Sequence, residues 1–198
     1  MSWLEVAYAY PPCLRASYRK GRLFRQWFKH YQGHLLFHER MFSSAQIPHS
    51  GPIEKAYFFH EFFMGTQYLH AGYEALLFYR EAEHKASYEK AKALLGGSAA
   101  AEIIIGPNER KGRPPDLLIF DHRTGRFHFV ECKGMSERFT KWQERRFADI
   151  EKYLNQNPPP CKQALDGPRR RDLFPSLLPG QWIHVVRLAP KHYAARLR

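Results

Sequence analysis

Cysteine is scarce in this sequence, and the three that occur, Cys13, Cys132 and Cys161, are scattered along the chain. They form no CxxC pair, and an odd number of scattered cysteines is not the framework of a disulfide-stabilised secreted domain. This usage is typical of a reducing compartment. We therefore expect a cytoplasmic protein, associated with the nucleoid if the cell is bacterial.

Long apolar runs are missing too. No stretch approaches the roughly 20 residues that a helix needs to span a bilayer. The N-terminal residues contain Glu5 and two prolines where a signal peptide needs a basic start and an apolar segment. We expect no membrane partner. The chain is not a disordered one either, because 44% of its 198 residues are hydrophobic and 15% are aromatic. It can bury a core in one domain with an appendage.

Acidic residues are few relative to basic ones. The chain has 19 Asp and Glu residues and 31 Lys and Arg residues, so the net charge is +12. A polyanion partner explains this balance most simply, with nucleic acid ahead of an anionic membrane. A generically basic protein, with its charges on solvated helix faces, is the alternative. The candidate nucleic-acid-binding residues are Arg19, Lys20, Arg22, Arg25, Lys29, Arg110, Lys111 and Arg113.

The pattern of apolar residues, glycines and prolines predicts a mixed α/β fold, with helices that pack on a central sheet. Residues 1–50 are predicted to form a basic, aromatic-rich helical extension, and residues 51–198 the main domain. Within them we expect helices over 14–42, 54–71, 82–95 and 136–157, the last with Ser136 as its N-cap, a strand over 73–80, a hairpin over 114–134 and a final strand from Gln181.

The hairpin segment PPDLLIFDHRTGRFHFVECKG places two acids and a lysine at the ends of apolar strands. Strand side chains alternate between faces, so Glu131 and Lys133 point to one side and Cys132 to the other. A two-residue loop at Arg123-Thr124 sets Asp116 directly across from Glu131, about 5 Å away between Cβ atoms. A three-residue loop with a bulge at Gly125 shifts the pair by about one place.

Two facing carboxylates repel each other unless a cation lies between them or one is protonated. Oxygen ligands beside an ammonium group point to a hard cation such as Mg²⁺ and to an anionic substrate. In that case the metal polarises a phosphoryl oxygen, and Lys133 orients a water or stabilises transition-state charge. The alternative is an ordinary hairpin with solvated charges at its ends.

The next predicted helix carries a polar residue in its apolar stripe. Gln143 falls four residues after Phe139 and four before Phe147. A polar side chain on a buried helix face needs a partner, and the end of the hairpin would supply one. The alternative is a glutamine at the edge of the stripe that bonds to solvent or backbone.

Together these residues resemble the PD-(D/E)XK nuclease superfamily. The motif appears as Pro115-Asp116 followed by Glu131-Cys132-Lys133, and the helix with Gln143 is similar to that of the VRR-NUC branch. The resemblance covers roughly residues 54–190. It implies a restriction-endonuclease-like core of helix, three-stranded meander, helix and final strand, which cuts phosphodiester bonds with Mg²⁺ or Mn²⁺.

The resemblance also implies roles for individual residues. Asp116 and Glu131 would be metal ligands, the Cys132 carbonyl would add a backbone oxygen, Lys133 would act on the nucleophilic water and Gln143 would position the site. The family tends to place a glutamate on the first core helix. Glu61 is the first candidate for that ligand and Glu83 the second, and local pairing of an exposed Glu61 is the alternative.

The sequence therefore favours a metal-dependent deoxyribonuclease, a hydrolase of structure-specific type that acts on branched, flapped or otherwise structured DNA. Domains of this type often pair, so a homodimer fits, and repair, recombination, mobile-element and defence roles stay open. A non-catalytic nucleic-acid-binding module on the same scaffold and an RNA-directed nuclease are the rival functions. Zinc bound by His30, His34 and His38, spaced four apart, is a further alternative.

Overall fold

The fold is described from a computed structural model, which describes residues 3–38, 48, 50–53, 58–77, 79–80, 84–106, 113–123, 125–159 and 181–191. Its elements run through the sequence as β1 (Leu4–Tyr10), α1 (Pro12–Arg19), α2 (Arg22–His30), α4 (Phe59–His70), β2 (Glu74–Leu76), α5 (Lys85–Leu95), α6 (Ser98–Ile105), β3 (Leu117–Phe120), β4 (Phe127–Gly134), α7 (Lys141–Gln156) and β5 (Ile183–Pro190). Among these described helices, none is long and apolar enough to cross a membrane.

The strands form one five-stranded sheet in the order β1-β5-β4-β3-β2. β2, β3 and β4 make an antiparallel meander, whereas β5 runs parallel to β4 and β1 runs parallel to β5. The prediction of a mixed α/β fold with a central mixed sheet is confirmed. α7 lies between β4 and β5 in the sequence, which is the connection that two neighbouring parallel strands require.

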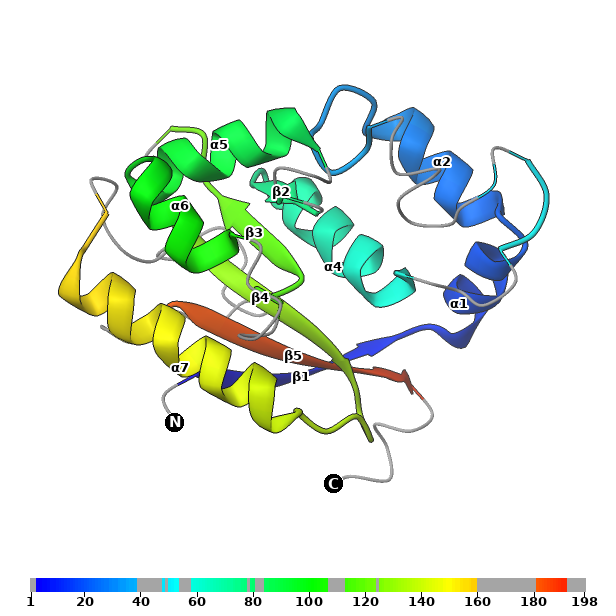
Figure 1. The fold of residues 1–198 in the computed structure, drawn as a ribbon. Coiled ribbons are helices and arrows are strands. Elements are labelled where there is room, and N and C mark those ends of the chain that lie inside the picture. Colours follow the sequence, from blue (N-terminus) through cyan, green and yellow to red (C-terminus); the bar gives the residue numbers. More distant parts are fainter. Residues whose placement is uncertain are drawn as a thin grey trace.

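Helices cover both faces of this sheet (Figure 1). α1, α2 and α4 share an apolar cluster with one face, to which Leu117, Val130 and Cys132 contribute. α5, α6 and α7 share a second cluster with the other face, to which Leu118 and Phe129 contribute. Alternation along β3 and β4 therefore assigns the face of each side chain, and it puts the faces of Glu131 and Cys132 on opposite sides.

The N-terminal segment contains a strand that the sequence pattern did not predict. All seven residues of β1 pair with β5, from Leu4 opposite His184 to Tyr10 opposite Pro190. The amphipathic helices expected after it are present as α1 and α2, separated at Gly21, whose φ of 71° favours glycine. The segment before residue 50 and the segment after it share one sheet and one apolar cluster.

Two other elements differ from the expectation. The strand expected over 73–80 has only three residues, Glu74–Leu76. α6 was not predicted, because its run of alanines and isoleucines has no polar face to give a helical period. The helix expected over 54–71 ends as predicted, since Gly72 adopts the left-handed conformation just past it, with φ of 88°.

A histidine buried in the sheet makes the fold sensitive to acid. His128 is 3% exposed, its Nε2 lies 3.2 Å from the Tyr68 hydroxyl, and its ring centroid is 4.8 Å from that of His184. Burial, followed by the charge that His184 would carry, lowers the pKa of His128 well below 6.5. The unfolded chain takes up this proton near pH 6.5 while the folded chain does not, so stability is complete above that pH and falls below it.

We expect wild-type stability, relative to that of a His128→Phe variant, to fall by about 1 kcal/mol between pH 6.5 and 5.5. Urea denaturation at the two pH values measures it. His70→Gln, at an exposed position at the end of α4, is the matched control. A wild-type-to-variant difference that does not change with pH would contradict this account.

Candidate active site at the end of the hairpin

The register of the hairpin agrees with the two-residue-loop prediction. Leu117 pairs with Val130 and Phe120 with Phe127. Extended by one residue, this register sets Asp116 opposite Glu131. The loop itself differs from the prediction. The amide of Asp121 donates to the carbonyl of Arg126, and Gly125 takes a left-handed φ of 68° without shifting the register.

Two hydrogen bonds hold Asp116 and the residue before it in place. Its Oδ2 accepts a hydrogen bond of 2.8 Å from the amide of Cys132. The residue before it, Pro115, is held through its carbonyl by the hydroxyl of Tyr79. The thiol of Cys132 points into the cluster on the opposite face, as the alternation indicated, and burial raises its pKa well above the ordinary value.

Glu131 lies at the centre of the site. It is 2% exposed, and its Oε1 lies 2.8 Å from Nζ of Lys133. The Lys133 ammonium also lies 5.5 Å from the centroid of the Phe139 ring. Burial opposes the charged form of Lys133, but the charges of Glu131 and Asp116 outweigh it and raise its pKa. Lys133 is therefore a cation at neutral pH.

Gln143 connects α7 to the same carboxylate. Its Nε2 donates a hydrogen bond of 3.0 Å to Oε1 of Glu131, which is the partner that its place in the apolar stripe required. The side-chain Oε1 of Gln143 accepts a hydrogen bond from the backbone amide of Thr140. The backbone amide of Gln143 donates one to Oγ1 of Thr140. Thr140 is thus the N-cap of α7, and the prediction of Ser136 is wrong because this capping box starts the helix later.

Glu61 approaches the site from the other face of the sheet. It lies in the first turn of α4 and is partly buried. Burial and then the charge of Asp116 raise the pKa of Glu61 to about 8, and Lys133 opposes this shift. Glu61 is therefore near enough to interact with both. Glu83, the second candidate, lies outside the described residues.

Burial and mutual repulsion disfavour the charged forms of Glu61, Asp116 and Glu131, and a bound cation would stabilise them. Burial raises the pKa of Asp116 to about 6 and that of Glu131 well above its usual range, and the charge of Asp116 raises the latter further. Carboxylate oxygens fit Mg²⁺ or Mn²⁺. Within the described ranges, however, no three His, Cys, Asp or Glu side chains form a ready metal centre. Glu131 instead contacts Lys133 and Gln143.

A fourth acid near this site was missed by the sequence analysis. The charge of Glu137 raises the pKa of both Glu61 and Asp116, so it faces the same region. A turn brings it there, since its amide donates to the carbonyl of Gly134, 3.1 Å away. A Cβ at Gly134 would lie 3.1 Å from Oε1 of Glu137, so this side chain packs over the strand end. Strand alternation carries no signal for a residue in a turn.

An open pocket of about 470 Å³ adjoins this turn, and Arg15, His60 and Glu137 contribute to its lining. Burial and then the charge of Arg15 lower the pKa of His60, which favours the neutral imidazole. The pocket lies between α1, α4 and the ends of β4 and β5. Of the four acids, Glu137 is the one that contributes to its lining.

Most of the basic residues predicted to bind nucleic acid are exposed to solvent, but not all of them. Arg19, Lys20, Arg22, Lys29 and Arg113 are exposed. Arg25 is partly buried, and its guanidinium donates to the carbonyls of Gly51 and Lys20. Arg110 and Lys111 lie outside the described residues.

The three histidines spaced four apart do not share a helix face. α2 ends at His30, and the next two histidines, His34 and His38, lie outside any helix. Nδ1 of His34 contacts the buried Glu74, and the ring of His38 stacks on that of His84. The helical alignment that the zinc alternative needed is therefore absent from the described residues.

Comparison with known proteins adds no family. No protein-family model, no curated protein and no solved structure matches the chain. The function is therefore argued from the site and from the motif.

Proposed function

We propose that the chain is a metal-dependent nuclease that hydrolyses phosphodiester bonds in DNA, with a PD-(D/E)XK site of VRR-NUC type. One observation carries this proposal: the buried carboxylate of Glu131 contacts both Lys133 and Gln143. Asp116 lies across the hairpin from it. An exposed, solvated hairpin end would give none of these contacts.

The order of elements supports the same proposal. α4, β2, β3, β4, α7 and β5 occur in the order that the resemblance implies for a restriction-endonuclease-like core, with α5 and α6 inserted between β2 and β3. β1 then extends the sheet beyond β5. The net charge of +12 fits a polyanionic substrate.

Asp116, Glu131, Glu61 and the Cys132 carbonyl would hold Mg²⁺ or Mn²⁺, which would polarise a phosphoryl oxygen and acidify a bound water. The chain's own groups do the rest. Lys133 is held as a cation beside Glu131 and stabilises negative charge that develops on the phosphate. Gln143 fixes the orientation of the Glu131 carboxylate from a rigid, capped helix end.

Cleavage assays on labelled linear, nicked, flapped and four-way DNA, and on RNA of the same sequences, test the proposal. We expect cutting with Mg²⁺ or Mn²⁺, none in EDTA, and a loss of about 10²-fold or more in Asp116→Asn. Asp149→Asn, at an exposed position on α7, is the matched control. Salt-sensitive binding without cutting in any metal would instead favour a binding module, and cutting confined to RNA would change the substrate.

A further inference from the structure

One large aromatic side chain lies exposed beside the candidate site. Among the large hydrophobic residues that the structure describes, the exposed ones are Trp142, 57% exposed, and Ile103, 47% exposed. Trp142 belongs to the first turn of α7. A single exposed aromatic side chain is common on protein surfaces, so the residues around Trp142 decide whether it can serve as a binding surface.

Trp142 is accompanied by positive charge. The guanidinium of Arg145, one turn along the helix, lies 5.6 Å from the centroid of the indole ring. Arg138 and Lys141, close to Trp142 in the chain, are exposed. An aromatic face bordered by cations is complementary to a nucleotide, because the base stacks on the ring while the phosphates pair with the charges.

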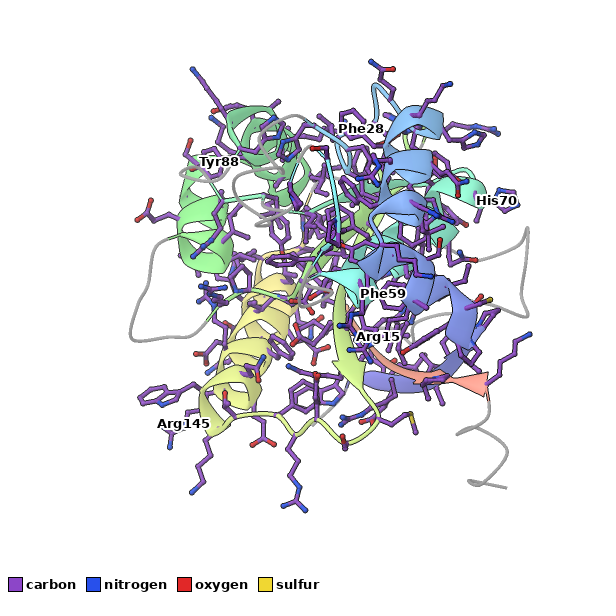
Figure 2. The ribbon with its side chains drawn as sticks, turned by 90° about the vertical axis from the view of Figure 1, so that its right-hand side faces the viewer. Arg15, Phe28, Phe59, His70, Tyr88 and Arg145 are labelled. Carbon is purple, nitrogen blue, oxygen red and sulfur yellow. The ribbon has the colours of Figure 1, made fainter. Side chains whose placement is uncertain are left out.

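The helix places this patch next to the acid cluster. The residue that follows Trp142 is Gln143, whose Nε2 is 3.0 Å from Glu131. The Cα atoms of Trp142 and Gln143 are therefore about 3.8 Å apart, while their side chains point about 100° apart around the helix. In Figure 2, β4 passes between α7, which carries Arg145, and α1, which carries Arg15. A nucleic-acid strand bound across the end of β4 would meet the pocket lined by Arg15 on one side and Trp142 on the other.

We propose that Trp142 and Arg145 form a stacking platform for an unpaired base, so that the substrate carries single-stranded nucleic acid next to the bond that is cut. A base inside a duplex has both faces covered by its neighbours, whereas an unpaired base has a face free to stack on the indole. This inference rests on the proposed function, and it narrows the substrate to flaps, overhangs and single strands.

Binding tests the platform separately from cleavage. Fluorescein-labelled 20-nucleotide single strands and blunt duplexes of the same sequence are titrated in EDTA, with anisotropy as the readout. We expect Trp142→Ala to weaken single-strand binding about tenfold and to leave duplex binding unchanged. Ile103→Ala, which truncates the other exposed hydrophobic residue, should change neither. Tryptophan fluorescence should be quenched by the single strand in the wild type, and less so in Trp142→Phe, which keeps most of the affinity.

Each result has a distinct meaning. Equal weakening of single-strand and duplex binding, no weakening of either, or no binding to any nucleic acid would overturn the platform. Selective weakening without metal-dependent cutting would support the platform and refute the nuclease. Cutting that requires Asp116 but is indifferent to Trp142 on flaps and duplexes alike would support the nuclease and refute the platform.

Discussion

Replacing Lys133 with methionine is expected to reduce the rate of DNA cleavage by about 10²–10³-fold while DNA binding changes little. Methionine keeps an apolar stem beside Phe139 and removes only the ammonium group, which lies 2.8 Å from Glu131. The loss should appear in kcat more than in KM, because the charge that Lys133 stabilises develops mainly in the transition state. Single-turnover cleavage at saturating protein measures it.

The matched control for this substitution is Lys85→Met, at an exposed position at the start of α5. It removes the same charge from the protein and should leave the cleavage rate unchanged. Retention of full activity in Lys133→Met would show that this ammonium group has no catalytic role. Arginine at position 133 tests charge alone, and because its guanidinium cannot occupy the same point, we expect it to restore little.

Without divalent cations, deprotonation of Glu61 is expected to lower the stability of the folded protein by about 2 kcal/mol between pH 6.5 and 8.5. The pKa of Glu61 is 4.5 in the unfolded chain and about 8 in the folded one. Between those values the folded protein holds a proton that the unfolded chain has released. The stability that this proton contributes falls as pH rises and is lost above pH 8. Above pH 6.5 the contribution of His128 rises by only about 0.4 kcal/mol more, so it does not mask the effect.

Mg²⁺ should restore this stability, and more so at pH 8.5 than at 6.5, because the metal and the protons compete for the same oxygens. Thermal denaturation measures both effects, with an expected metal-free decrease in Tm of about 4–8 °C across the range. Glu61→Gln should flatten the pH dependence, whereas Glu102→Gln, exposed on α6, should not. A Tm that is insensitive to Mg²⁺ at every pH would argue against a metal at this cluster.

The hairpin register and the orientation of Gln143 could be predicted because each follows from a local rule. Alternation along a strand determines which face Glu131 and Lys133 share, and helical spacing determines where Gln143 points. The strand β5 could be predicted because its residues are apolar over a whole run between turn signals. These features depend on residues close together in the sequence.

Other features depend on partners far away in the chain. β1 is a strand because β5 lies beside it, and the sequence of residues 4–10 does not reveal that partner. Glu61 comes close enough to interact with the charge of Asp116 only after α4 has packed on the sheet. The prediction of Glu61, rather than another glutamate, as a metal ligand therefore rested on the resemblance. Glu137 reaches the same region through a turn, and no periodic pattern marks a turn residue.

The pairing of β1 with β5 also has a kinetic consequence. Leu4 lies opposite His184, so this parallel pair joins segments 180 residues apart, and its loop-closure entropy must be lost before most of its contacts can form. Until β5 joins, β1 has no strand to pair with and β4 is an open sheet edge next to Glu131 and Lys133. The β3-β4 hairpin can therefore form early from local contacts, whereas completion of the sheet on that side should be the slow step of folding. During that step the open edge is prone to association with other chains.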